Sequence, residues 1–241
     1  MEFMQISDRQ KTILDTIIRE YVDSAKPVSS QYLGERYDFG ICPASIRIEM
    51  QKLTDDGFLT QPHTSAGRVP TDKGYRLFVN EILENAGEKK SSGRLDFSFE
   101  SYEEEFEDIF KLASSLTRGL ADASSSLVLG YLRHENLLWK EGWEDLLQNP
   151  EFGQRQAIDD FIGYLSYLEE SVRNRKSAPQ IDIYIGAENC FAKAGEFSAI
   201  TFALNPAENE EAIISIVGPK RMAYEKNIEL INETLKIFNE I

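Results

Sequence analysis

The sequence predicts an α+β fold in two domains, and three observations support this. Apolar residues recur at helical spacing through most of the first 85 residues. Further on, similar helical patterns alternate with short runs rich in β-branched and aromatic residues, which are typical of strands. Between these regions, residues 86–94 are rich in glycine, serine and lysine and have no apolar periodicity. We therefore expect domains at 1–85 and 95–241, joined by a linker at 86–94.

Composition narrows the class of protein. The chain has 241 residues, of which 41% are hydrophobic and 28% charged, values typical of a soluble globular protein. No apolar run reaches the roughly 20 residues that a membrane span needs, and no basic-then-apolar leader is visible at the start. The two cysteines are far apart in the sequence, which fits a reducing compartment. We expect a cytoplasmic protein with no membrane contact.

The net charge of −15 is unevenly distributed. Residues 1–90 carry 12 basic and 14 acidic side chains, a net of −2, whereas residues 91–241 carry 14 and 27, a net of −13. A nearly neutral domain can bind nucleic acid if its cations gather on one face. The charge therefore permits a nucleic-acid function for the first domain and argues against one for the second.

Two helices are predicted first. Ser7 and Gln10 form a capping box at the start of the first helix. Pro27 prevents this helix from continuing further along the chain. The apolar positions of this helix are Ile13, Leu14, Ile17, Ile18, Tyr21 and Val22. Ser29 or Ser30 caps a second helix that extends to about Tyr37, with Tyr32 and Leu33 facing inward.

A third helix runs from Pro43 to about Asp56, where Gly57 ends it. Its buried stripe is Ile46, Met50 and Leu53. Residues 58–60 form a strand that enters a short polar loop, and Thr71 caps a fourth helix. The apolar positions of this fourth helix are Tyr75, Leu77, Phe78, Ile82 and Leu83. Helices followed by a loop between strand-like ends predict a winged helix-turn-helix domain.

The outward face of the third helix offers candidate contacts to DNA bases. Arginine pairs with guanine, glutamine pairs with adenine, and an apolar side chain can touch a thymine methyl group. The candidate residues are Ser45, Arg47, Ile48, Gln51 and Lys52. The alternative is an ordinary solvated helix face.

The loop offers candidate phosphate contacts. Arg68 is the residue expected to reach a groove or a phosphate, and Thr64, Ser65 and the backbone at Gly67 can donate to phosphate oxygens. His63 can also contact phosphate, although a local hydrogen-bonding role is favoured for it. In the next helix, Lys73 and Arg76 are placed to steady the DNA backbone, and pairing of Arg76 with a carboxylate is an equal alternative.

The second domain is predicted to combine strands and helices. A strand at 95–99 precedes a helix with a heptad-like seam, which packs either on its own sheet or in a coiled coil. The seam is Tyr102, Phe106, Ile109, Ala113, Leu116 and Leu120. Further strands are predicted at 127–132, 181–185, 199–204 and 212–217, with a helix at 158–172 and an irregular segment at 133–153. A last helix begins near Pro219 and buries Ile228, Ile231, Leu235 and Phe238.

Catalytic chemistry has almost no support from the residues. Cys42 and Cys190 have no partner at metal-binding spacing, and His134 is isolated in the sequence. Phosphate-binding, nucleophile-elbow and zinc-protease motifs are missing from the sequence. We expect no catalytic residue, metal or cofactor.

Several segments resemble the HrcA family of heat-inducible transcription repressors. The matching residues in the first domain are 43–47, 49–50, 53, 57–59, 61–76 and 78–79. Near the end of the chain, residues 185–189 and 217–224 resemble the closing segments of that family, and residues 113–117 match more weakly.

The resemblance implies a winged-helix domain followed by a GAF-like domain through which the protein forms a homodimer. It also implies repression of chaperone operons by binding an inverted repeat in double-stranded DNA, with a GroEL-type chaperonin as a partner. The chain is shorter than typical members between about residues 133 and 180, so a reduced insert is expected. Ile48 stands where the family usually has asparagine.

Two other functions remain open from the sequence. The GAF-like domain can act as a sensor in a small-molecule-gated transcription regulator, or the winged helix can bind protein in a structural adaptor. Double-stranded DNA binding with steep salt dependence distinguishes the repressor from the adaptor.

Overall fold

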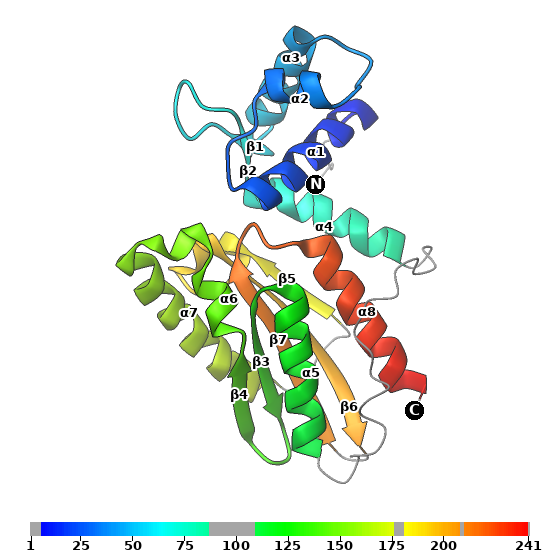
Figure 1. The fold of residues 1–241 in the computed structure, drawn as a ribbon, viewed down its shortest axis with the longest axis vertical. Coiled ribbons are helices and arrows are strands. Elements are labelled where there is room, and N and C mark those ends of the chain that lie inside the picture. The colour runs from blue at the N-terminus through cyan, green and yellow to red at the C-terminus, as the bar shows by residue number, and fades with distance from the viewer. Residues whose placement is uncertain (1–5, 87–108, 176–180, 208–209, 241) are drawn as a thin grey trace. The chain divides into compact units, whose positions relative to one another are not determined.

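The chain divides into two compact units, Met1–Glu84 and Asn85–Ile241 (Figure 1). The computed structural model describes residues 6–86, 109–175, 181–207 and 210–240. The predicted strand at 95–99, the first seam residues Tyr102 and Phe106, and nearly all of the predicted linker lie outside the described residues.

The first unit consists of helices and one small antiparallel sheet. Its elements are α1 (Asp8–Ser24), α2 (Ser30–Arg36), α3 (Pro43–Asp55), β1 (Leu59–Thr60), β2 (Val69–Pro70) and α4 (Asp72–Ala86). Leu59 pairs with Pro70 and Thr60 with Val69, so the loop of residues 61–68 leaves and returns at neighbouring positions. Figure 1 shows this loop extending away from the helices of its unit.

The helix ends confirm the capping predictions. Ser7 caps α1 in a reciprocal capping box with Gln10, and the Ser29 side chain accepts from the backbone N–H of Tyr32 at the start of α2. Pro43 occupies the first turn of α3, where its missing N–H costs no intrahelical bond. Gly57, with φ +79°, follows that helix in a left-handed conformation that favours glycine.

The core of the first unit follows the predicted pattern fully on α3 and in part on α1 and α2. Ile46, Met50 and Leu53 are buried, as predicted. On α4 the prediction was partly wrong, because the buried residues are Tyr75, Phe78 and Val79. Their spacing of three and four residues defines the inward face. Leu83 is therefore exposed, and Leu77 and Ile82 are half-buried. On the other two helices, Tyr21 and Val22 of α1 and Tyr32 of α2 are also half-buried.

Glu20 joins α1 to α2. Its carboxylate accepts hydrogen bonds from the hydroxyl of Tyr32 at 2.5 Å and from the hydroxyl of Tyr37. These two bonds, the Tyr32 bond first, lower the pKa of Glu20 below its ordinary value of 4.5. A carboxyl group with a lowered folded-state pKa stabilises the fold above its unfolded-state pKa and loses that contribution as pH falls through the folded value.

We therefore expect Glu20→Gln to lower the thermal stability of the first unit at pH 7. The difference from the wild type should narrow as pH falls below 4.5, because the wild-type carboxylate then gains a proton. Thermal melting, monitored through the amide NMR signals of α1, measures this difference. A constant difference from pH 7 to pH 3 would rule out a contribution from the ionised carboxylate.

The second unit is a five-stranded antiparallel sheet with helices. Its strands are β3 (Leu127–Leu132), β4 (Leu137–Glu141), β5 (Ile181–Ile185), β6 (Phe197–Ala207) and β7 (Glu210–Pro219). The spatial order is β4-β3-β7-β6-β5. The longer helices are α5 (Ile109–Ser124), α7 (Arg155–Asn174) and α8 (Tyr224–Glu240), with α6 (Trp143–Leu147) a single short turn. The described residues also form short 3-10 helices, η2 (Pro150–Gly153), η3 (Gly186–Glu188) and η4 (Ala194–Glu196).

Both faces of the sheet are covered, so the unit has three layers (Figure 1). Leu129, Ile213 and Ala199 share one face and pack in a single buried cluster with Phe161 and Leu165 of α7. The alternate residues of β3, β6 and β7 lie on the opposite face, toward α5 and α8. Burial on both sides explains why apolar residues predominate on both faces of the central strands.

Gly130 leaves room for a tryptophan on the α5 side of the sheet. It lies opposite Trp139 of β4, and a Cβ atom on Gly130 would come within 2.3 Å of the indole ring. The indole Nε1 donates to Thr117 Oγ1 of α5 at 2.7 Å, and Phe110 contacts the ring edge-on with 5.4 Å between centroids. The missing side chain at Gly130 thus lets the edge strand β4 pack against α5.

Two predictions for this unit were wrong. Residues 133–153 are not irregular, since they contain β4, α6 and η2. The last helix begins at Tyr224 and not near Pro219, because β7 continues to Pro219, which pairs with Phe197. Ile228, Ile231 and Leu235 are buried as predicted, whereas Phe238 is half-buried. The strands at 127–132 and 181–185 have the predicted bounds, and β6, β7 and α7 are longer than predicted.

Candidate nucleic-acid interface

The outward face of α3 carries the predicted base-contacting side chains. Because Ile46, Met50 and Leu53 face the core, Arg47 and Ile48 point to solvent, with Ile48 57% exposed. Gln51 and Lys52 are also exposed, and Ser45 is half-buried.

Arg47 and Lys52 differ in their surroundings. No hydrogen bond or ion pair involves the Arg47 guanidinium among the residues that the structure describes, so it is free to meet a ligand. Lys52 forms an ion pair with Glu49 one turn earlier, with 3.0 Å between Nζ and Oε1. Arg47 is therefore the cation of α3 best placed to form a two-bond contact with a guanine.

Cys42 is the N-cap residue of α3 and is exposed. Its Sγ lies 3.5 Å from Ser45 Oγ. Hydrogen bonds from the side chain and then the backbone of Ser45 lower the pKa of the thiol. The Ser45 hydroxyl thus has a partner inside the helix cap, although it still borders the outward face.

The loop between β1 and β2 is held in shape by Gln61. Its amide Nε2 donates to the backbone oxygens of Thr64 and Ala66, both at 2.9 Å, and the N–H of Ala66 donates to His63 O at 2.9 Å. His63, Thr64 and Ser65 are exposed at the tip. The loop therefore presents an imidazole and two hydroxyl groups from a backbone with internal hydrogen bonds.

Gly67 lies too close to a neighbouring chain segment to carry a side chain. A Cβ atom at this position would lie 2.3 Å from Val28 O and 2.8 Å from the Pro27 carbonyl carbon. We expect Gly67→Ala to destabilise the first unit by about 1–3 kcal/mol, because backbone must shift to make room. Urea unfolding followed by amide NMR signals of α3 measures this loss.

Gly153→Ala is the control for the glycine substitution. An added Cβ atom there meets nothing within 4 Å, so unfolding of that variant should match the wild type. Equal stability of Gly67→Ala and the wild type would contradict the close approach of the loop to Val28.

Arg68 is half-buried and directed at α3. Its Nε donates to Thr54 Oγ1 at 3.0 Å, and its Nη2 donates to Gln51 Oε1 at 2.9 Å. Gln51 in turn donates to Asp55 Oδ1 at 2.8 Å. Neither Thr54 nor Asp55 is among the predicted site residues, although their positions three and four residues after Gln51 place them beside it on a helix.

Of the two cations predicted on α4, Lys73 is bound within the protein. Its Nζ donates to Asp56 O at 2.7 Å, just after the end of α3, and lies 4.2 Å from the centre of the Phe58 ring. This cation complements the negative end of the α3 dipole. Arg76 is half-buried on the same helix.

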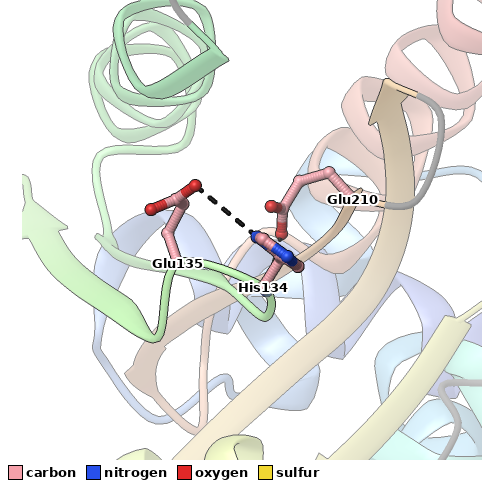
Figure 2. Close-up of side chains that lie close together, drawn as sticks. All are labelled: His134, Glu135 and Glu210. Atoms are coloured by element: carbon pink, nitrogen blue, oxygen red, sulfur yellow. Dashed lines mark hydrogen bonds and ion pairs between the residues drawn. The ribbon is translucent and has the colours of Figure 1, made fainter.

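A second group of polar side chains lies in the other unit. Figure 2 shows His134 and Glu135 at the turn between β3 and β4, beside Glu210 at the start of β7. One potential metal-ligand atom from each lies within 4.8 Å of the others, so His134 is not isolated in the fold as it is in the sequence. Glu210 is buried, and its Oε1 accepts from the His134 backbone N–H at 3.0 Å.

This contact gives Glu210 a structural role in ordering the turn. His134 and Glu135 are both exposed, and their side chains lie 3.6 Å apart between Nδ1 and Oε1. Exposed carboxylates gather in this manner without an ion. We assign the three residues a structural role, in which Glu210 of β7 holds the turn between β3 and β4, and we assign them no chemical role.

One pocket lies between α7 and the β5–β6 edge of the sheet. Its volume is about 220 Å³, and its lining includes Tyr167, Tyr184, Asn189 and Thr201. Ligand sites for small molecules usually occupy about 300–1,000 Å³. The charged residue of its lining, Arg175, already forms an ion pair with Asp182. The pocket gives little support to small-molecule sensing.

Across the described parts of the chain, every helix is too short or too polar to cross a membrane.

Comparisons with known proteins identify relatives of both units. The family model described as the HrcA protein C terminal domain matches residues 77–228, which is more than half of the chain. A heat-inducible transcription repressor HrcA of Chlorobium phaeobacteroides is 38% identical over 344 residues, covering 96% of this chain and 97% of the relative. That alignment is longer than the 241-residue chain, so the relative has residues that this chain lacks.

A second relative matches only in part, and one solved structure shares the fold. The heat-inducible transcription repressor HrcA of Natranaerobius thermophilus is 54% identical over 80 residues, covering 33% of this chain and 23% of the relative. The crystal structure of a hypothetical protein superposes with a TM-score of 0.82 at 20% identity, covering 98% of both chains. From the family match and the full-length relative, the chain belongs to the HrcA family of heat-inducible transcription repressors.

Proposed function

We propose that this protein represses heat-shock genes by binding double-stranded DNA through its first unit. The outward face of α3 carries the proposal, because it presents Arg47, which has no partner among the described residues, and Ile48, which is 57% exposed. These side chains suit guanine and thymine edges in a major groove. Family membership supports the repressor function, since the curated relatives are named heat-inducible transcription repressors.

The proposal assigns a winged helix-turn-helix fold to residues 1–85. Helix α3 is then the recognition helix, and the loop between β1 and β2 is the wing. Exposed His63, Thr64 and Ser65 contact phosphates from the wing. Lys52 and Arg76 add positive charge around the contact, and Lys73 positions the end of α3.

The second predicted domain, residues 95–241, is proposed as a GAF-like dimerisation domain with a reduced insert. Residues 91–241 carry a net charge of −13, which disfavours contact with a phosphate backbone. We therefore assign this domain to self-association and not to DNA contact. A homodimer places two α3 helices on an inverted repeat whose half-sites are separated by whole helical turns of about 34–36 Å.

A GroEL-type chaperonin is included as a partner on the strength of family resemblance. Such a partner links the level of free chaperone to repression in the cytoplasm. Purified chaperonin should then increase the fraction of this protein that retains DNA, and a fraction that stays constant would remove the chaperonin from the proposal.

Selection of bound duplexes from a random pool tests the proposed function. The wild-type protein should recover an inverted repeat, and its affinity for that duplex should fall steeply as salt rises, because phosphate contacts release counterions. Recovery of a single half-site would contradict the dimer alone. Failure to enrich any duplex would contradict DNA binding itself.

A further inference from the structure

We propose that Arg68 is a positioning residue that locks the wing to α3, and that Gln51 holds Arg68 and reads no base. This inference rests on the proposed function and assigns roles within its DNA-binding face. Base reading from α3 then falls to Arg47 and Ile48, with Ser45 at the edge.

The backbone of Arg68 anchors the base of the wing. Its N–H donates to Val28 O at 2.8 Å, and its carbonyl oxygen accepts from the Val28 N–H at 2.9 Å. Val28 is buried and lies just before α2. The close approach of Gly67 to the same carbonyl leaves little freedom at this point of the wing.

The side chain of Arg68 makes the second anchor. Nε donates to Thr54 Oγ1 at 3.0 Å and Nη2 donates to Gln51 Oε1 at 2.9 Å. Two N–H groups of one planar guanidinium therefore bridge one turn of α3. The Thr54 hydroxyl donates in turn to Met50 O at 2.8 Å. Such a fork has a fixed geometry that a lysine ammonium cannot reproduce.

Gln51 has both ends of its amide occupied. Its oxygen accepts from Arg68, and its nitrogen donates to Asp55 Oδ1 at 2.8 Å. A glutamine that reads adenine uses the same oxygen and nitrogen together. Reading a base would therefore break two bonds to charged groups, each stronger than an ordinary neutral hydrogen bond.

The wing itself contains no lysine or arginine between Gln61 and Gly67. Its exposed tip offers His63 and two hydroxyl groups, so its phosphate contacts depend on how firmly the backbone is placed. By fixing the base of the wing to Val28 and to α3, Arg68 sets the direction in which that tip points. Its effect on binding is therefore exerted through other residues.

The test uses the full chain and the duplex that the wild type selects from a random pool. Affinity is measured over a series of salt concentrations for Arg68→Lys, Arg68→Gln and Gln51→Ala, and circular dichroism checks that each variant is folded. Arg68→Lys should lose roughly tenfold in affinity, nearly as much as Arg68→Gln, because lysine keeps the charge and loses the fork.

The salt dependence and the selected sequences separate this role from direct contact. A phosphate contact at Arg68 would reduce the slope of log affinity against log salt by about 0.9 in Arg68→Gln and leave it unchanged in Arg68→Lys. The positioning role predicts equal slopes in these two variants. Gln51→Ala should select the same sequence as the wild type, and its loss should not add to that of Arg68→Gln.

Three outcomes would overturn the inference while leaving the proposed function standing. They are wild-type affinity in Arg68→Lys, a changed base preference at one position in Gln51→Ala, and additive losses in the double variant. Gln51 is exposed, so its variant remains informative even if the Arg68 variants fail to fold. A wild-type protein that selects no duplex would contradict the proposed function instead.

Discussion

Arg47→Ala is expected to weaken binding to the selected duplex by about 1–3 kcal/mol, the range for loss of a two-bond arginine–guanine contact. Affinity for random duplex should fall much less. Selection with the variant should recover a sequence that has lost its preference at one position of each half-site. Competition binding against both duplexes measures the specific and non-specific losses separately.

Arg155→Ala is the matched control for charge. Its side chain is 93% exposed on α7, in the acidic unit, and its Nε lies 3.9 Å from Asp159 Oδ2. The control removes the same charge and should leave the affinity for both duplexes within about twofold. Equal losses on specific and random DNA for Arg47→Ala would show that Arg47 contacts phosphate and not a base.

Phe161→Ala is expected to destabilise the second unit by about 3–5 kcal/mol, the usual loss when a buried aromatic ring is removed from a core. The ring is 1% exposed and contacts Phe152 and Phe197 edge-on, with 5.1 Å between centroids in each case. Trp143 also packs against it at 6.4 Å. Its removal leaves a cavity between α7 and the sheet that the neighbouring rings cannot fill completely.

Tryptophan fluorescence isolates this measurement, because both tryptophans of the chain, Trp139 and Trp143, belong to the second unit. Ile162→Ala is the matched control, since Ile162 follows Phe161 directly and is 50% exposed. It should shift the free energy of unfolding by no more than about 0.5 kcal/mol. Similar urea midpoints for the two variants would contradict the assignment of Phe161 to the core.

The spacing of apolar residues and the residues at helix ends predicted the elements that depend on interactions between neighbours in the sequence. The spacing of Ile46, Met50 and Leu53 set the buried face of α3, and Pro43 and Gly57 set its ends. The outward positions of Arg47 and Ile48 follow from the same spacing. The exposed face of the candidate site could therefore be predicted from sequence without any knowledge of tertiary structure.

Features that depend on pairing between distant segments could not be predicted. β4 is an edge strand of Leu, Leu, Trp, Lys and Glu, a composition with no β-branched residue, and it forms because it pairs with β3. The sequence predicts that Arg68 reaches a groove or a phosphate, and only the fold shows that Thr54 and Gln51 lie within reach of its guanidinium. Glu210 reaches His134 for the same reason, since β7 lies beside β3.

Amide NMR mapping of the selected duplex on the full chain tests the central claim most directly. Signals of α3 residues 45–52 and of the wing at 61–68 are predicted to shift as the duplex is added, while those of the sheet residues in β3 and β7 remain unchanged. Shifts confined to the second unit, or no shift anywhere at a duplex concentration well above that of the protein, would contradict DNA binding by α3 and the wing.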